Sequence, residues 1–517
     1  MKVKNPILTG FNPDPAICRA GNTYYIATST FEVYPGICIH ESKDLVNWKL
    51  VAHPLKTLQI DMTNNSPSSG VWAPDLTFRN GMFYIVFSNV ETFSKGPIKD
   101  CYNYLISSPS IKGPWSRPVF INASGFDASL FHDEDGKSYF VNMEWDYRGI
   151  KGSPCFTGIL VQEIDLKTAT LIGKAHKIFS GTKRGFVEGP HIYKRNDYYY
   201  LFCAEGGTGY NHAESVSRSK LIYGPYELHP NELILSSKDT DAYLQRAGHA
   251  SLVNGKEDGW FIAHLCSRPI DQKCILGRET ALQNIIWKED WPYLAHGSIV
   301  PRDYYEVNKE VEVMDFNQDI TYDFLSERFD LDFQTLRIDM SSYVKKTRNA
   351  ITLIGKQSFN SNYLQNTWQR RQQHFNCEFG CRVSFEPFYF GHMAGLIYRY
   401  QEGDFYLLYS TYDEEKGQVL RLHAEHEFQP EYFKESILPY KGDISLKIRV
   451  HGKDAQFYYA LDHEKFYPFG PVLDATKLSD QFVTHGGFTG AFFGLYASDS
   501  LYACKEATFS KVYYKKL

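Results

Sequence analysis

The stretch DASLFHDEDGKSYFV (residues 127–141) places an acidic residue before a short apolar segment, a Gly/Asp turn and an aromatic segment. Two strand-forming segments around such a turn predict a β-hairpin. The same order recurs at residues 14–27, 75–86, 188–201 and 249–262, with a histidine replacing the acid in the last copy. Successive copies begin 61, 52, 61 and 61 residues apart. This spacing is typical of β-propeller blades and predicts five blades over residues 1–300.

The first residues of the five copies are expected to meet at one end of the propeller. The first strand of each blade lies innermost and lines the central channel. A ring of side chains around one mouth of the channel therefore consists of Asp14, Asp75, Asp127, Glu188 and His249. The second strand of each hairpin returns to this mouth and brings back Phe31, Trp145 and Glu205.

The repeat stops near residue 300, and the pattern changes. Residues 301–324 read as a polar connector. From residue 325 to 517 apolar and polar residues alternate in segments such as ISLKIRV (444–450) and GAFFGLY (490–496). This period of two predicts antiparallel strands and a second domain that is a β-sandwich. The whole chain is therefore predicted to be all-β.

Composition narrows the class of partner. The chain of 517 residues is 43% hydrophobic and 22% charged, as expected for a folded protein, and its net charge is −5 without a basic run. These values argue against nucleic acid or a membrane as the main partner. The N-terminal residues lack a signal-like apolar stretch, which predicts a cytoplasmic protein. The ten cysteines are scattered, and the close pair Cys377 and Cys381 has no further ligands for a zinc site.

A ring of carboxyl groups suits the hydrolysis of a glycosidic bond. This reaction needs an acid that protonates the leaving oxygen and a base or nucleophile on the opposite face of the sugar. Crowded acids raise the pKa of at least one member, which then keeps its proton near neutral pH. Most carboxylates in a chain are only solvated or turn-capping groups, so the fivefold register is what distinguishes this set.

Seven short motifs in order along the chain carry a family resemblance. They are NPDP (12–15), WAPD (72–75), GFDASLF (125–131), VEGPH (187–191), GHAS (248–251), LGRET (276–280) and GGFTGAF (486–492). Together they resemble glycoside hydrolase family 43, in its β-xylosidase branch with a C-terminal concanavalin-like β-sandwich. The resemblance covers essentially the whole chain.

The resemblance implies a role for each of three acids. Asp14 is expected to be the general base that activates water and Glu188 the general acid, while Asp127 orients the acid and keeps its pKa high. The implied reaction releases terminal β-D-xylose from xylooligosaccharides with inversion. The alternatives are an α-L-arabinofuranosidase, an enzyme with both activities, or a carbohydrate-binding propeller without catalysis.

Supporting residues follow from the same resemblance. Arg278 is expected against sugar hydroxyls and the catalytic acids, with a structural salt bridge as the rival interpretation. Phe31, Trp72 and Trp145 are expected to form apolar walls that stack on the sugar, with core packing as the alternative. Asp75 either assists at the pocket or braces its blade.

Two further residues complete the expected site. His249 is expected on the propeller axis, where it holds a water or a calcium ion or is a neutral core histidine, so calcium is left open and no cofactor is required. Phe488 is expected on a loop of the sandwich that narrows the pocket, which would favour attack at chain ends. The substrate is an oligosaccharide, and the resemblance implies a homo-oligomer, a dimer or a tetramer.

Overall fold

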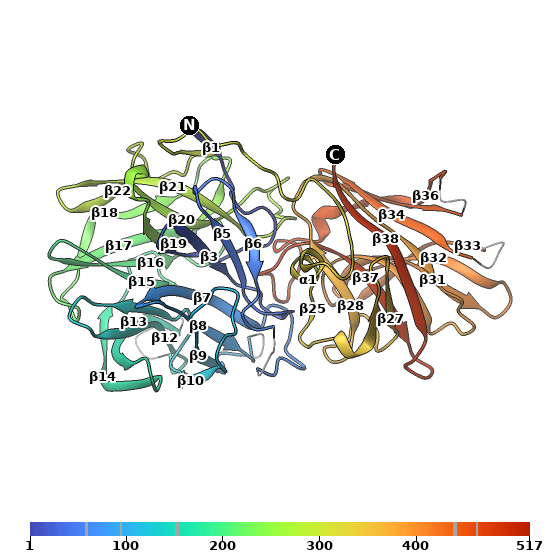
Figure 1. Cartoon of the computed structure of the whole chain (residues 1–517), viewed down its shortest axis with the longest axis horizontal. Helices are drawn as coiled ribbons and strands as arrows, with labels where there is room; N and C mark the ends of the chain where they lie inside the picture. Colours follow the sequence, from blue (N-terminus) through green and yellow to red (C-terminus); the bar gives the residue numbers. More distant parts are fainter. Residues whose placement is uncertain (57–59, 94–95, 150–154, 438–441, 462–463) are drawn as a thin grey trace.

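The protein folds into two lobes that lie side by side, one formed by the first part of the chain and one by the last (Figure 1). The computed structural model describes residues 1–517 except 57–59, 94–95, 150–154, 438–441 and 462–463. Within the described residues the one α-helix is α1 (Glu327–Asp332). The all-β prediction is confirmed.

The first lobe contains five four-stranded antiparallel sheets, and in each sheet the strands follow one another in chain order. The sheets are β2 (Ala16–Ala20), β3 (Thr23–Thr28), β5 (Cys38–Ser42), β6 (Lys49–Ala52); β7 (Gly70–Arg79), β8 (Met82–Val90), β9 (Cys101–Ser108), β10 (Val119–Asn122); β11 (Ser129–His132), β12 (Ser138–Asp146), β13 (Cys155–Asp165), β14 (Thr170–Phe179); β15 (Glu188–Arg195), β16 (Tyr198–Glu205), β17 (Ala213–Ser219), β18 (Glu227–Ser236); and β19 (Gln245–Asn254), β20 (Trp260–Ser267), β21 (Glu279–Lys288), β22 (Trp291–Leu294).

The five sheets are the blades of a closed propeller. The first strands contact one another in the cyclic order β2, β7, β11, β15 and β19, and β19 returns to β2. Such a closed ring of inner strands leaves no long exposed sheet edge at the centre. The strand β1 (Lys2–Lys4) pairs with β23 (Tyr304–Glu306), so the two ends of this lobe are joined. The predicted five-bladed propeller is confirmed.

The second lobe is a two-sheet sandwich with an apolar core between the sheets. The predicted concanavalin-like sandwich is confirmed. One sheet contains β24 (Asp319–Thr321), β26 (Val344–Lys346), β27 (Ala350–Ile354), β38 (Glu506–Lys516), β29 (Asn376–Ser384), β34 (Ile444–His451), β35 (Asp454–Ala460) and β36 (Tyr467–Asp474). The other contains β28 (Asn366–Arg371), β37 (Phe492–Asp499), β30 (His392–Gln401), β31 (Asp404–Asp413), β32 (Gly417–His426) and β33 (Gln429–Ile437).

The segment 301–324 is shared between the two lobes. Its strand β23 pairs with β1 of the propeller, whereas β24 pairs with β38 of the sandwich. The predicted limits of the connector, residues 301 and 324, stay predictions.

The buried residue Arg337 of the sandwich contacts the propeller. The short strands β4 (Val33–Tyr34) and β25 (Thr335–Leu336) pair across the junction, and Arg337 follows directly. Arg337 donates from its backbone to the Glu32 carbonyl (2.7 Å) and from its two terminal nitrogens to both carboxylate oxygens of Glu402 (2.9 and 3.1 Å). Arg337 and Glu402 are each 1% exposed. The Arg337 Nε also donates to the Asn65 carbonyl of the propeller at 2.7 Å, so the bidentate pair within the second lobe holds in place the side chain that makes this link.

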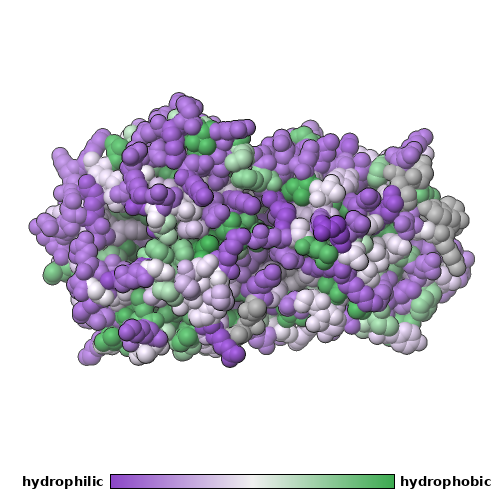
Figure 2. All heavy atoms as spheres, viewed as in Figure 1, coloured by the Kyte–Doolittle hydropathy of each residue, from purple (hydrophilic) through white to green (hydrophobic). Residues whose placement is uncertain are grey.

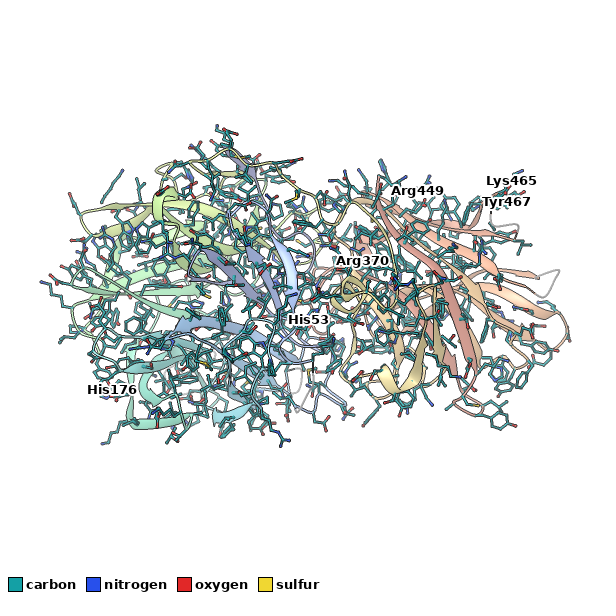
Figure 3. The ribbon with its side chains drawn as sticks, viewed as in Figure 1. His53, His176, Arg370, Arg449, Lys465 and Tyr467 are labelled. Carbon is teal, nitrogen blue, oxygen red and sulfur yellow. The ribbon has the colours of Figure 1, made fainter. Side chains whose placement is uncertain are left out.

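His53 makes a second link at the junction, where Figure 3 labels it. Its Nδ1 lies 2.9 Å from the Ile37 carbonyl of the propeller, and its Nε2 lies 2.9 Å from the Leu331 carbonyl in α1. Two carbonyl partners are both satisfied only by an imidazolium, which donates from each nitrogen. Although burial lowers the pKa of His53, Cys38 and the two carbonyls raise it above the ordinary value.

We expect the Arg337–Glu402 pair to be essential for stability. Arg337→Met leaves Glu402 buried with one cation fewer and should lower the free energy of unfolding by about 3 kcal/mol. Urea unfolding measures the change. The control is Arg449→Met, which removes an arginine whose side chain is 46% exposed and is paired with Glu378. Equal unfolding midpoints for the two variants would contradict this role of Arg337.

Candidate active site

The inner strands bring most of the predicted acids to one place. Asp14 and Asp127 lie just before β2 and β11, Glu188 opens β15 and His249 lies within β19. Asp14, Asp127 and His249 line one small cavity together with Gly189, the residue after Glu188. All four of the predicted side chains are buried. Ala73 and Pro74 of β7 line the same cavity, so the site lies where all five first strands meet.

A left-handed backbone conformation sets the side-chain direction of several residues of the site. Asp14, Asp127 and His249 have φ of 54°, 53° and 48°, which is the left-handed region. Gly189 has φ of 54°, and a Cβ there would lie 3.0 Å from the His249 ring. Left-handed φ costs a non-glycine residue on the order of 1 kcal/mol. The same strained turn at equivalent positions of several blades indicates that side-chain direction here is maintained at the expense of stability.

Asp14 is paired with a cation. Arg278 donates from Nη1 to Oδ1 at 2.8 Å, and Ser29 donates its hydroxyl to Oδ2 at 2.6 Å. The Ser29 oxygen is itself oriented by the backbone N–H of Ala73 at 2.7 Å. His249 Nδ1 lies 3.7 Å from Oδ1. A guanidinium and a hydroxyl donor both stabilise negative charge on this carboxylate.

Glu188 has the opposite environment. Burial raises the pKa of its carboxyl well above the ordinary value, and the charges of Asp127 and Asp14 raise it further, against a lowering by Arg278. Within the described part of the chain, no cation forms an ion pair with Glu188. Burial and Asp14 likewise raise the pKa of Asp127, although the Gly189 N–H donates to Asp127 Oδ2 at 3.0 Å. The cluster therefore combines a carboxyl group paired with a cation, Asp14, and a carboxyl group with a raised pKa, Glu188.

Arg278 connects the acids to the second lobe. It precedes β21, and its Nη2 donates to the Phe488 carbonyl at 3.2 Å. Its guanidinium carbon lies 5.3 Å from the Phe31 ring centre and 5.4 Å from that of Phe488. Its Nε is buried without a hydrogen-bond partner among the described residues. This free donor is available to a bound hydroxyl.

The loop that carries Phe488 fits closely against the propeller. The Ala491 N–H donates to the Ile275 carbonyl at 3.0 Å, and the Phe488 N–H donates to Ser68 Oγ at 3.2 Å. A Cβ on Gly277 would lie 2.3 Å from the Thr489 carbonyl, so only glycine permits this approach. The motifs LGRET and GGFTGAF therefore meet in space.

Three of the expected aromatic residues form one wall. The ring centres of Phe31 and Trp72 lie 5.7 Å apart, and those of Phe488 lie 5.9 Å from Phe31 and 5.6 Å from Trp72. These spacings are typical of packed aromatic pairs. Phe488 comes from the sandwich, so both lobes contribute to this aromatic cluster, and whether it stacks on a sugar or only packs the core stays a prediction.

Trp145 and Asp75 contact residues other than the three predicted catalytic acids. Trp145 packs at 5.7 Å on Phe126, which in turn packs at 5.3 Å on Trp72. Asp75 accepts from the Leu130 N–H at 2.8 Å and lies 3.4 Å from His191 Nδ1, so it joins the second blade to the third and fourth. These contacts favour a bracing role for Asp75, and whether either residue binds substrate stays a prediction.

His249 is a buried neutral histidine, and whether a water or a calcium ion binds beside it stays a prediction. Burial lowers the pKa of its ring to about 4, so the imidazole is neutral. Among the described residues no group of three or more His, Cys, Asp or Glu side chains could hold a metal ion. Calcium prefers six to eight oxygen ligands, and the described side chains around His249 do not supply them.

Sequence reasoning missed several residues of the site. Ser29, which bonds Asp14, carries no motif of its own. Phe93 packs 4.9 Å from Phe488 but belongs to no quoted motif, and Phe126, which packs on Trp72, stood in the motif GFDASLF without an assigned part. His191 was visible in the VEGPH motif without an assigned part.

Family models match both lobes. Residues 3–292 match the model for glycosyl hydrolases family 43, and residues 321–515 match that of a beta xylosidase C-terminal concanavalin A-like domain. The propeller and the sandwich thus correspond to separate matched units.

Named relatives match over nearly their whole length. The xylosidase/arabinosidase 43B of Humicola insolens is 43% identical, with 99% of this chain and 98% of the relative covered. The beta-xylosidase of Bacillus subtilis is 42% identical, with 97% of each covered. The crystal structure of xylan beta-1,4-xylosidase from Bacillus halodurans has a TM-score of 0.95 at 40% identity, covering 99% of this chain and 100% of that one. The chain belongs to glycosyl hydrolase family 43.

Proposed function

We propose that the protein is an exo-acting glycoside hydrolase that releases terminal β-D-xylose from xylooligosaccharides with inversion. The observation that carries this proposal is the contrast between Asp14, paired with Arg278, and Glu188, whose pKa is raised by burial and neighbouring acids. A base and an acid on one sugar are what inverting hydrolysis requires. The names of the relatives support xylose as the sugar.

The proposed reaction follows from these protonation states. Glu188 donates its proton to the glycosidic oxygen as the bond to the anomeric carbon breaks. Asp14 accepts a proton from the water that attacks this carbon from the opposite face. Asp127 is a positioning residue that, when it is ionised, raises the pKa of the Glu188 carboxyl. Arg278 orients Asp14 and offers Nε to a sugar hydroxyl.

The wall from the sandwich supports attack at chain ends. Phe488 packs against Phe31 and Trp72 and brings the second lobe to the acids. Aromatic rings at the Phe488 side of the pocket leave room for one terminal sugar. They hinder a polysaccharide chain whose next sugars would have to extend past Phe488. We therefore infer exo action.

An α-L-arabinofuranosidase activity is the second candidate. Two relatives carry both activities in their printed names, and arabinofuranose presents similar hydroxyl positions to one pocket. Rates on nitrophenyl β-D-xylopyranoside and nitrophenyl α-L-arabinofuranoside measure the two activities in one preparation.

Other inferences complete the proposal. We expect an oligosaccharide as the only required ligand, activity in the presence of a chelator, a cytoplasmic location and a dimeric or tetrameric assembly. The described residues contain no helix that is long and apolar enough to span a bilayer. Size-exclusion chromatography with light scattering measures the assembly.

Glu188→Ala should reveal an acid through its dependence on the leaving group. We expect a loss of about 10²- to 10⁴-fold in kcat on xylobiose, whose leaving alcohol needs a proton. The loss should be much smaller on dinitrophenyl β-D-xylopyranoside, whose leaving phenolate needs none. Asp14→Ala should lose activity on both substrates. Glu134→Ala, at an exposed glutamate, is the matched control. Equal losses for Glu188→Ala on both substrates would contradict its role as the acid.

Glu188→Gln should make the inactive protein more stable near neutral pH. The pKa of Glu188 is higher in the folded protein than the ordinary glutamate value of about 4.3. The protonated carboxyl therefore contributes fully to stability below pH about 4.3, and this contribution is lost as the pH rises through the pKa of the folded protein. An amide keeps the shape without the charge. Thermal melting should show a gain near neutral pH that vanishes at pH about 4. A lower melting temperature of the variant near neutral pH would contradict the raised pKa.

A further inference from the structure

A second cavity lies at the junction of the two lobes, away from the acids. This junction cavity has a volume of about 630 Å³, within the range of small-ligand sites. The propeller lines it with the N-terminal segment 3–9 and part of β6, and the sandwich lines it with the ends of β28 and β38. Hydrophilic residues gather where the two lobes meet on the face drawn in Figure 2.

The lining carries more positive than negative charge. The cationic side chains are Lys4, Arg268, Arg328, Arg370, Arg371 and Lys516, and the anionic side chains are Asp315 and Asp332.

Three of these cations already have carboxylate partners. Arg328 contacts Asp332 at 2.6 Å, and Lys516 contacts Asp315 at 2.7 Å. Arg268 forms a bidentate pair with Glu279 at 2.7 Å, behind the lining. Arg370, Arg371 and Lys4 remain without a carboxylate side chain of the lining as an ion-pair partner among the described residues.

The two adjacent arginines at the end of β28 are deeply buried. Arg370 is 2% exposed and Arg371 is 7% exposed, and Figure 3 places Arg370 on the sandwich side of the junction. In the part of the chain that the structure describes, neither forms an ion pair with a carboxylate. A buried guanidinium is costly without a counter-charge, because its hydration is lost.

The partners of both arginines are neutral acceptors or a thiol. Arg370 donates to the Tyr322 hydroxyl (2.7 Å), the Gln373 side chain (2.6 Å) and the Arg371 carbonyl (3.4 Å). Arg371 donates to the Phe11 carbonyl (2.7 Å), to the Gln334 side chain and to Cys38 Sγ (3.1 Å). A guanidinium has five N–H groups, so donors remain on each.

Cys38 does not balance these charges. Burial raises the pKa of its thiol, but Arg371 and His53 lower it by more, so the net shift is downward. A thiolate here would face the His53 imidazolium as well as Arg371. One thiolate between two cations leaves a positive charge unbalanced.

His40 adds a further polar group with an unpaired nitrogen to the lining of the junction cavity. This residue lines the junction cavity and is 8% exposed. Its Nδ1 has no hydrogen-bond partner among the described residues. Burial lowers its pKa to about 3, so it is a neutral imidazole that can donate a hydrogen bond without adding charge.

We propose that the junction cavity binds a small oxyanion, a phosphate or carboxylate group, through Arg370 and Arg371. The planar guanidinium fork matches such groups in bidentate geometry. The ligand would supply the missing counter-charge between the lobes. It would also contact the segment that leads to Asp14, because Arg371 holds the Phe11 carbonyl.

Isothermal titration calorimetry of the full chain tests this site. Inorganic phosphate and acetate are titrated separately at an ionic strength fixed with sodium chloride. We expect saturable binding of at least one of the two anions, at one site per chain. The anion that binds shows whether the site prefers phosphate or carboxylate. Arg370→Gln should abolish this binding, whereas Arg449→Gln, at an exposed arginine of the sandwich, should retain it.

Two more variants keep the test decisive. Lys4→Glu reverses a charge at an exposed lining residue, so it should fold normally and weaken the binding several-fold. Arg278→Gln alters the cation of the catalytic pocket and should leave the binding unchanged. Absence of saturable binding for both anions would overturn the proposal. Binding that survives Arg370→Gln and Lys4→Glu but is lost in Arg278→Gln would also overturn it.

Discussion

The contact between Arg278 and Asp14 is the interaction on which the site depends. One guanidinium joins the carboxylate before β2, the start of β21 in the last blade and the Phe488 carbonyl of the sandwich. It therefore closes the propeller ring and positions the second lobe at the same point. Because it forms its ion pair with Asp14 and none with Glu188, it also distinguishes the two carboxyl groups as a base and an acid.

The geometry of the site is maintained at a cost to the fold. Left-handed residues in the inner strands, buried like-charged acids and a buried Arg337–Glu402 pair each oppose stability unless their surroundings hold them. Closure of the ring and the large apolar cores of both lobes provide that support. The sandwich is thus part of the site, because its loop lies within hydrogen-bond distance of Arg278.

The sequence predicted the architecture well because a spacing repeated in five blades specifies topology directly. The fivefold register also placed Asp14, Asp127, Glu188 and His249 together, since equivalent positions of inner strands converge. It could not separate Asp75 from this set, because the direction of a side chain depends on local φ angles that no spacing encodes. Ser29 and the buried arginines of β28 escaped for a similar reason, since their partners are distant in sequence.

The most direct test of the account is proton NMR of the first product released from xylobiose. If Asp14 activates water, the newly formed xylose appears first as the α-anomer, before mutarotation produces the β-anomer. Initial appearance of β-xylose would contradict the account, because it would mean that a carboxylate attacks the sugar and that Asp14 is not a general base.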